Sequence, residues 1–553
     1  METVRVSVMG DAPREVAAGT TLGELARDYA HRRAGDILLA RCGNRFFELN
    51  DPVQAGEVDF VDITDPEGRR VYARALSFVM LRAVRDVLGP EVRVVVENSL
   101  VKNYYCEIES PRLPVTPALL AQIEGRMRKL AEAKAPIRKA YFSPEEGYEL
   151  LKGQGLEDKV ELFRYKQTAA VKLYELDGYY NYFYSLMPPD CSYVRYFGLV
   201  PHENGFLLVL PRDNAPRAIE PPILPQKISA VFMEQVDWCR LMDVRNIAEL
   251  NRTIVEDTFR DLVCVNEALH EKKFAQMADA ICSRPEPVKI VLISGPSSSG
   301  KTTGANRLCV QLRVNGVEPH VISMDDYFID RAKTPLGPDG KPDMESVYNL
   351  DLERFTHDLN ALIAGEETEI PRYNFITGTR EPVGKRLRLG KNSLCVIEGI
   401  HGLNPLVTRG VPVQNTFKIF ISAMTQLNVD DHDNISTTDS RMIRRIVRDH
   451  QRRGYSAVET IRMWPSVTRG EADNIFPYQE NADMIYNSAT IYELAVLKPY
   501  VEPLLYQVGP EQPEYPTAQR LLRFLDAFLP VGSESIPTNS IIREFVGGSI
   551  FHV

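Results

Sequence analysis

The spacing of hydrophobic and polar residues changes along the chain, and these changes predict its organisation. Near the N-terminus, segment 4–8 (VRVSV) alternates apolar and polar positions, as a half-buried strand does. Segment 20–30 has apolar residues at helical spacing behind two threonines, either of which can cap a helix. Segments 36–44 and 58–63 predict further strands. Residues 1–64 are therefore expected to form a small α+β domain.

A second region of mixed helices and strands is predicted over residues 65–215. Segment 72–89 has the apolar spacing of a long helix, and it ends at a glycine followed by a proline. Segments 92–98 and 104–109 are rich in β-branched and aromatic residues and predict strands. The proline-rich stretch 211–225 is the candidate boundary of this region.

The remaining patterns predict a connector, a parallel sheet and a tail. Residues 216–286 are mostly helical in pattern and are expected to pack as a connector. Residues 287–500 alternate short apolar runs with helical segments, which is typical of a parallel sheet covered on both faces. The tail 501–553 contains one clear helix pattern and is expected to dock on the rest of the protein. The apolar runs are 289–294, 320–323, 393–397, 416–422 and 483–487.

Composition narrows the class of protein. The 553 residues are 44% hydrophobic and 25% charged, which is ordinary for a soluble globular chain. The formal net charge of −10 disfavours a chain-wide basic surface for nucleic acid. The eight cysteines are scattered without a C-x-x-C pair, which favours a reducing, cytoplasmic location over a disulfide framework. There is no apolar stretch of about 18 residues, so no membrane partner is expected.

The strongest motif is GPSSSGKTT, which begins at Gly295. It satisfies G-x-x-x-x-G-K-[ST] between a predicted strand and a predicted helix, the context that a P-loop requires. Glycines let backbone N–H groups wrap the phosphates, and the helix N-terminus adds partial positive charge. Lys301 is expected between the β- and γ-phosphates, and the Thr302 hydroxyl is expected on Mg²⁺. The predicted ATP-binding residues are Gly295, Ser297, Ser298, Ser299, Gly300, Lys301, Thr302 and Thr303, although the motif does not separate ATP from GTP.

Two acidic segments follow the motif. Asp325 and Asp326 end the second apolar run, where either could accept a proton from a substrate hydroxyl or simply lie in a solvated turn. Glu398 directly follows another apolar strand and could hold Mg²⁺ through water, the alternative being a surface acid at a strand end. We interpret the nearby His401 as a hydrogen-bonded structural histidine.

A basic helix pattern lies further along, in the segment SRMIRRIVRDHQRRGYS. Arg441, Arg445, Arg448 and Arg452 fall on one helical face. A lid of arginines would neutralise a transferring phosphoryl group and exclude water. The alternative is a basic helix that binds RNA or an acidic partner. The overall acidic charge and the position downstream of a P-loop favour the lid.

These segments, together with IPRYNF at 370–375, resemble the uridine kinase and phosphoribulokinase family of P-loop kinases over about residues 287–500. The resemblance implies that Asp325 is the catalytic base, with Asp326 as its neighbour. It implies that Tyr373 and the lid residue Arg445 contact the substrate. Glu345 is at the spacing of an aspartate that binds ribose hydroxyls in this family.

The chain departs from the family pattern at two further positions. Gly378 stands where the family has a histidine that recognises the base, and Tyr455 replaces a second lid arginine. Losing a hydrogen bond to the base can change selectivity by orders of magnitude. A nucleoside is therefore the expected acceptor, while uridine itself stays open.

The front half resembles the N-terminal region of threonyl-tRNA synthetase. Residues 1–64 are similar to its TGS domain, and 65–215 to its editing-type domain. That domain normally carries H-x-x-x-H on a helix, whereas segment 73–80 here has no histidine. The partnering C-x-x-x-H is missing around 181–191 as well. We therefore expect no zinc and no aminoacyl-tRNA hydrolysis, and no synthetase core follows that could charge tRNA.

The combined prediction is an α/β P-loop kinase domain preceded by α+β TGS-like and editing-like domains. The expected activity is transfer of the γ-phosphoryl group of ATP, with Mg²⁺, to a nucleoside 5′-hydroxyl. One alternative acceptor is another sugar or sugar phosphate. An alternative of another class is an RNA-binding regulator in which the P-loop acts as a nucleotide-controlled switch, and the front module could bind RNA or a small regulator in either case.

Overall fold

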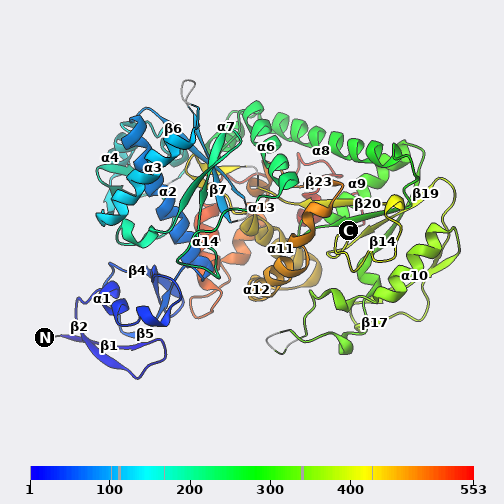
Figure 1. Ribbon diagram of the computed structural model, residues 1–553, viewed down its shortest axis with the longest axis horizontal. Helices are drawn as coiled ribbons and strands as arrows, with labels where there is room; N and C mark the ends of the chain where they lie inside the picture. Colours follow the sequence, from blue (N-terminus) through cyan, green and yellow to red (C-terminus); the bar gives the residue numbers. More distant parts are fainter. Residues whose placement is uncertain are drawn as a thin grey trace.

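The protein is described by a computed structural model. It describes residues 2–100, 102–109, 114–166, 168–337, 340, 342–425 and 427–552. Figure 1 shows an elongated molecule with the N-terminal segments at one end and the large parallel sheet towards the other. The last residues of the chain return to the middle of the molecule, beside this sheet.

The first unit is a five-stranded sheet with one short helix. Thr21 caps helix α1 (Leu22–Arg27) through a capping box with Glu24, and Leu22 and Leu25 point into the core. The prediction of a small α+β unit is therefore confirmed. The strands run in the order β2-β1-β5-β3-β4 and comprise β1 (Thr3–Val8), β2 (Arg14–Ala17), β3 (Leu39–Cys42), β4 (Arg45–Glu48) and β5 (Gly56–Val61).

The second unit is organised around the buried helix α2 (Pro66–Leu88). Asp65 caps this helix, Pro66 occupies its first turn, and Gly89 ends it at a φ of 98°. Two antiparallel sheets, β11-β12-β7-β6 and β10-β9-β8, complete the unit. Its other elements are β6 (Arg93–Leu100), β7 (Asn103–Glu109), α3 (Pro117–Glu132), β8 (Ile137–Phe142), α4 (Pro144–Lys152), α5 (Glu157–Arg164), β9 (Val171–Leu176), β10 (Tyr179–Asn181), β11 (Gly198–His202) and β12 (Gly205–Val209).

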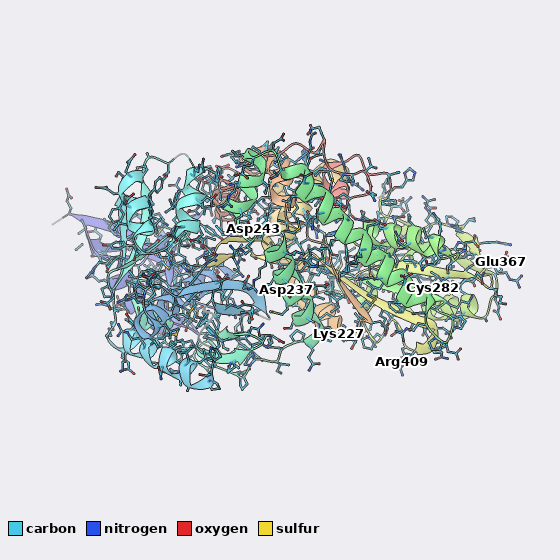
Figure 2. All side chains as sticks on the ribbon, turned by 90° about the horizontal axis from the view of Figure 1, so that it is seen from above. Lys227, Asp237, Asp243, Cys282, Glu367 and Arg409 are labelled. Carbon is cyan, nitrogen blue, oxygen red and sulfur yellow. The ribbon has the colours of Figure 1, made fainter. Side chains whose placement is uncertain are left out.

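Three helices connect this front half to the sheet-containing half. They are α6 (Gln226–Leu241), α7 (Ile247–Val255) and α8 (Phe259–Cys282). Figure 2 shows α6, marked by Lys227 and Asp237, lying between the two halves, while α8 continues to Cys282 over the second half. The helices pack on their neighbours through buried side chains, so they are structural parts of the body.

The second half contains a five-stranded parallel sheet in the order β14-β19-β13-β20-β23. All five strands match the apolar runs, which confirms the predicted parallel sheet. The carboxyl ends of parallel strands share one edge, and ligands bind there in open α/β sheets. The strands are β13 (Ile290–Ser294), β14 (Glu318–Ser323), β19 (Ser393–Glu398), β20 (Thr416–Ser422) and β23 (Met484–Asn487).

Further helices and short two-stranded sheets complete this half. The helices are α9 (Lys301–Val314), α10 (Leu352–Ile363), α11 (Thr437–Arg453), α12 (Ala457–Asn474), α13 (Glu493–Leu505), α14 (Tyr515–Leu525) and α15 (Arg543–Val546). The short strands are β15 (Thr368–Ile370), β16 (Tyr373–Asn374), β17 (Thr379–Arg380), β18 (Lys385–Leu387), β21 (Asn428–Asp430) and β22 (Asp433–Asn434).

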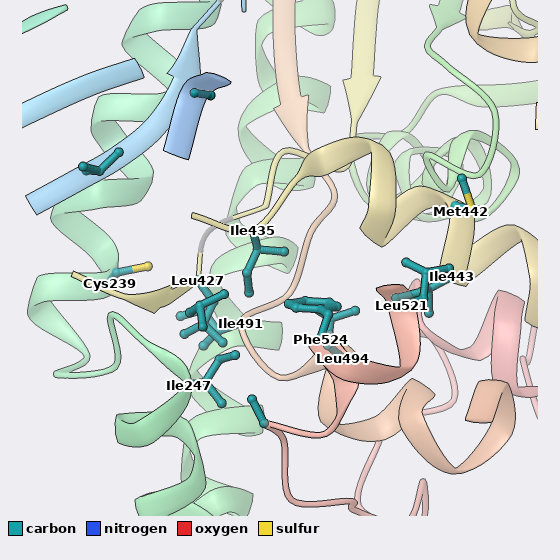
Figure 3. Close-up of a cluster of buried hydrophobic side chains, with 14 of the residues drawn as sticks. Cys239, Ile247, Leu427, Ile435, Met442, Ile443, Ile491, Leu494, Leu521 and Phe524 are labelled. Carbon is teal, nitrogen blue, oxygen red and sulfur yellow. The ribbon is translucent and has the colours of Figure 1, made fainter. Parts of the chain in front are cut away.

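One hydrophobic core runs through both halves. Figure 3 shows Ile247 of α7, Leu427 and Ile435 beside hairpin β21–β22, and Phe524 of α14 gathered in one cluster. Because these residues come from segments far apart in the sequence, their burial fixes the front half, the connector and the C-terminal helices on the sheet-containing half. Among the described residues, no helix is long and apolar enough to cross a membrane.

Candidate active site

The loop between β13 and α9 has the backbone that phosphate binding requires. A Cβ at Gly295 would lie 1.9 Å from the carbonyl oxygen of Ile421, so only glycine fits beside strand β20. Gly300 and Ser298 both have positive φ, of 80° and 59°. The loop thus folds into a tight turn directly before a helix N-terminus, the arrangement that presents backbone N–H groups to an anion.

Polar atoms of this loop are left available for a ligand. The Lys301 ammonium donates to the carbonyl oxygens of Gly295 and Pro296, both at 3.0 Å. The hydroxyl groups of Ser298 and Ser299 are buried and have no hydrogen-bond partner among the described residues. Buried polar groups are normally paired, so these orphaned groups fit a phosphate that completes the loop.

Two carboxylates from neighbouring strand ends face Lys301. Asp325 follows β14 and Glu398 ends β19, and the two strands are adjacent in the sheet. Burial raises the pKa of Asp325 to about 6, while Lys301 opposes the shift and Asp326 adds to it. Burial likewise raises the pKa of Glu398 to about 7, together with repulsion from Asp325. Carboxylates with raised pKa values at a sheet edge are typical of a functional site.

The two neighbouring aspartates have different surroundings. Asp325 is half-buried and its charge interacts with Lys301 and Glu345. Asp326 instead accepts a hydrogen bond of 3.2 Å from the backbone N–H of Tyr373, and it is less buried. Asp325 therefore faces the phosphate loop, whereas Asp326 fixes the start of β16.

Glu345 reaches the same site from a loop. Gly470 of α12 makes this possible, because a Cβ there would lie 2.2 Å from the Cβ of Glu345. Burial raises the pKa of Glu345 to about 7, Arg445 lowers it and Glu471 raises it. The loop, the basic helix and the phosphate loop thus meet at Glu345.

The arginines of the basic helix α11 contact the phosphate loop in two ways. Arg441 and Arg444 are buried and form ion pairs with Glu471 and Glu493, respectively. Both donate to backbone carbonyl oxygens of the phosphate loop, Arg441 to Ser297 and Arg444 to Ser298. Arg445 pairs with the buried Asp449 and also donates to the Ser297 hydroxyl at 2.8 Å, so it contacts a side chain of the loop.

The remaining expected substrate residues lie in the hairpin β16–β17. Tyr373 is buried and contacts Phe328 and Phe375, with ring centroids 5.7 Å and 5.2 Å away. Gly378 closes the hairpin with a φ of 71°, a conformation that a histidine would adopt only with strain. Tyr455 follows the glycine that ends α11 and is 39% exposed.

The C-terminal segment contributes residues that the sequence patterns did not reveal. Ile541 packs so closely on the phosphate loop that a Cβ at Gly300 would lie 2.7 Å from it. Glu544 accepts a hydrogen bond of 2.7 Å from the Thr303 hydroxyl. These contacts join positions about 240 residues apart in the chain, and a local motif carries no signal for such a pairing.

Thr302 and Glu398 offer the oxygen donors that Mg²⁺ prefers, beside the phosphate loop. Among the residues described, no group of three or more His, Cys, Asp or Glu side chains could hold a metal by itself. His401 is buried, which lowers its pKa to about 4 and leaves its ring neutral.

Aromatic and charged side chains pack around helix α2 in the front half, where the editing-type residues would lie. Phe78 packs against Phe183 with ring centroids 5.3 Å apart, and Arg74 stacks over Tyr184. Arg74 also pairs with Asp433, which belongs to hairpin β21–β22 of the second half. The predictions of no zinc and no hydrolysis at this helix stay predictions.

Comparisons with known proteins agree with this division. Residues 290–495 match the Phosphoribulokinase / Uridine kinase family. The N-terminal region matches threonine–tRNA ligases. The one from Syntrophotalea carbinolica is 26% identical over 253 residues, 45% of this chain and 39% of the relative. The one from Desulforamulus reducens is 27% identical over 160 residues, 29% of this chain and 25% of the relative. The matches thus span less than half the length of these curated relatives.

Solved structures of kinases are also similar. A possible uridine kinase from Bacillus stearothermophilus has 20% sequence identity and a TM-score of 0.28, covering 39% of this chain and 98% of that protein. D-glycerate 3-kinase from Cryptococcus neoformans has 14% identity and a TM-score of 0.20, covering 48% of this chain and 87% of that protein.

The fold and the site define the class of the second half: it is an α/β P-loop phosphotransferase domain. Residues 290–495 match the model of the phosphoribulokinase and uridine kinase family. The front half is similar to threonine–tRNA ligases, so the chain joins parts related to two different protein families. The predicted fold class and family resemblance are confirmed.

Proposed function

We propose that the protein is an ATP- and Mg²⁺-dependent nucleoside kinase that phosphorylates a 5′-hydroxyl. The observation that carries the proposal is the meeting of Lys301, Asp325 and Glu345 at one sheet edge, with burial raising the pKa of both carboxyl groups. When bound, Mg·ATP supplies the transferable phosphoryl group. Phosphoryl transfer otherwise needs positioning and charge stabilisation, which side chains at this edge are able to provide.

Each side chain has a proposed task. The loop Gly295–Thr303 and Lys301 hold the phosphates, and Thr302 with Glu398 holds the metal ion. Asp325 accepts the proton of the acceptor hydroxyl and orients its oxygen, as a half-buried carboxylate with a pKa of about 6 is able to do near neutral pH. Glu345 and Tyr373 bind the sugar side. Arg445 stabilises the negative charge that develops on the transferring group.

A second acceptor class is supported by one observation. Gly378 is a turn glycine with positive φ, so this position offers no side chain to recognise a base. A pentose or sugar phosphate needs no such contact, because its hydroxyl groups are bound by carboxylates and arginines. The proposal of a nucleoside acceptor therefore rests on Glu345 and Tyr373 and not on base recognition.

Acceptor-dependent ADP release tests the proposal. Purified full-length protein with Mg·ATP is assayed with nucleosides, pentoses and sugar phosphates, and Lys301→Ala serves as the inactive control. A nucleoside that raises ADP release at least about tenfold would support the proposal. Stimulation by sugar phosphates alone would favour the second acceptor class. ATP turnover that responds only to RNA, with a steep salt dependence, would overturn both.

A further inference from the structure

A second cavity lies where the front half, the connector and the phosphotransferase domain meet. Its volume is about 550 Å³, and it is separate from the acceptor side of the phosphate loop. Arg70 and Arg74 of α2 form one wall and Phe232 of α6 another. The opposite wall is the first turn of α11 together with Phe420 of β20. Three parts of the chain thus enclose a space large enough for a small molecule.

The lining combines aromatic rings with one guanidinium group that is only partly paired. Tyr104, Tyr184 and Phe232 present apolar surface to the cavity. Arg74 is nine-tenths buried, and its Nη1 has no hydrogen-bond partner among the described residues although its Nε lies 3.3 Å from Asp433. An unpaired buried guanidinium nitrogen calls for an acceptor.

The start of α11 lies at the same cavity. Thr437 and Thr438 line it in the first turn of this 17-residue helix. The N-cap Ser436 accepts from the N–H of Asp439, and the Asp439 carboxylate pairs with Arg520, so this helix end is already capped. The unpaired nitrogen of Arg74 therefore supplies the attraction for an anionic ligand group, a carboxylate or a phosphate.

One side chain connects this cavity to the phosphate loop. Arg441 lines the cavity and donates to the carbonyl oxygen of Ser297 at 3.4 Å. Its ion-pair partner Glu471 accepts from the N–H of Ser297 at 2.9 Å. A shift of Arg441 would therefore move the backbone on both sides of one loop residue.

We propose that this cavity binds a small aromatic anion, and that the ligand changes nucleotide affinity through Arg441. The binding site stands on the cavity alone, whereas the coupling rests on nucleotide binding at the phosphate loop. Neither part requires that the acceptor be a nucleoside. Linkage makes the effect reciprocal, so nucleotide must change the affinity of the anion by the same factor.

The aromatic anion 8-anilinonaphthalene-1-sulfonate, followed by fluorescence titration of the full-length protein, tests the site. We expect saturable one-to-one binding. Ala472→Trp places a large ring at an exposed position of the cavity lining and should weaken binding at least about tenfold. Ser466→Trp, exposed on the same helix outside the lining, should leave binding unchanged. Equal binding by both variants, or no saturable binding, would overturn the proposal.

Two further measurements identify the anionic group of the ligand and test its coupling to nucleotide binding. Displacement of the probe by uridine monophosphate points to a phosphate ester, and displacement by N-acetyltyrosine points to a carboxylate. Displacement by neither would overturn the assignment of an aromatic anion. A saturating probe should change the dissociation constant of Mg·ATP, measured by direct binding, about fivefold or more. An unchanged constant would overturn the coupling, and this readout does not depend on turnover.

Discussion

Buried charges gather at two places in this protein, and the two places use them differently. At the phosphate loop, Lys301 donates to backbone carbonyls while Asp325 and Glu398 have raised pKa values. At the seam between the two halves, Lys159 lies 2.6 Å from Asp430, and both side chains are at most 1% exposed. In the first cluster the buried hydroxyl groups of Ser298 and Ser299 have no hydrogen-bond partner among the described residues, whereas the Lys159–Asp430 pair joins two parts of the protein.

The seam carries further paired charges on the same hairpin. Asp431 accepts two hydrogen bonds from Arg93, and its backbone N–H donates to Asp158. Hairpin β21–β22 directly precedes helix α11, which holds the phosphate loop. We call the phosphate-loop charges, which lie at a sheet edge, the open cluster, and the seam charges, which join the two halves, the closed cluster. The following changes should break or sharpen this contrast.

The largest effect is expected at the open cluster. Asp325→Asn removes the proposed base and should lower kcat about 10²- to 10⁴-fold, because proton transfer by a positioned carboxylate contributes that much. Asp326→Asn is the matched control, since Asp326 bonds the backbone of Tyr373 and should change kcat far less. Steady-state ADP release with the preferred acceptor measures both. Equal losses in the two variants would contradict the distinction between these aspartates.

Breaking the closed cluster should cost stability. Lys159→Met leaves Asp430 buried without its partner and should lower the free energy of unfolding by about 3–5 kcal/mol. Urea denaturation measures the loss. The double variant Lys159→Met/Asp430→Leu should recover part of it, because Asp430 no longer lies buried without its partner, while Asp158 still lacks the charge of Lys159.

An exposed ion pair provides the comparison for the loss of stability expected at Lys159. Arg138 pairs with Glu175 at 3.2 Å, but its side chain is 68% exposed. Arg138→Ala should therefore change the free energy of unfolding by less than about 1 kcal/mol. A loss at Lys159 no larger than this would show that the seam is not a stabilising contact.

Gly470→Ala should displace Glu345 and thereby test whether this side chain of the open cluster binds the acceptor. The new methyl group would lie 2.2 Å from the Cβ of Glu345, so the loop must move away from the phosphate loop at a cost of about 1–3 kcal/mol. We expect the KM for the acceptor to rise while the KM for ATP stays close to that of the unchanged protein. Gly125→Ala, where a Cβ meets nothing within 4 Å, is the control. An acceptor KM that does not move would exclude Glu345 from acceptor binding.

A further effect concerns the pH dependence of stability. Glu345 has a pKa near 7 in the folded protein and 4.5 as its ordinary value, so between about pH 4.5 and 7 the folded state holds a proton that the unfolded chain has lost. Stability must then fall as the pH rises through this window. Glu345→Gln should remove about 1–3 kcal/mol of that fall between pH 5 and pH 8, as measured by urea denaturation at both values. Parallel pH dependences in the two proteins would contradict the raised pKa.

Activity should rise with pH, which is opposite to the expected change in stability. Asp325 must lose its proton to act as a base, so kcat/KM should rise as the pH is raised through about 6. The same carboxylates that reduce stability near neutral pH are therefore the ones that the proposed reaction uses.

Local patterns were sufficient for the elements of the fold and for part of the site. The period of apolar residues predicted the five parallel strands, since side-chain burial repeats with the geometry of each element. The motif at Gly295 predicted the phosphate loop, because its glycines and lysine are required by local backbone geometry. The two aspartates could not be distinguished, since both follow the same strand and only packing against Tyr373 separates them.

The sequence by itself determined which segments form strands, where the phosphate loop lies and which carboxylates end the strands beside it. Only the tertiary structure decided that Arg441 and Arg444 are neutralised by Glu471 and Glu493 while Arg445 faces the loop. It alone placed Glu544 on Thr303 and hairpin β21–β22 against the front half. The physical reason is that helix and strand periods are local, whereas a buried charge is satisfied by whichever partner the folded chain brings within hydrogen-bond distance.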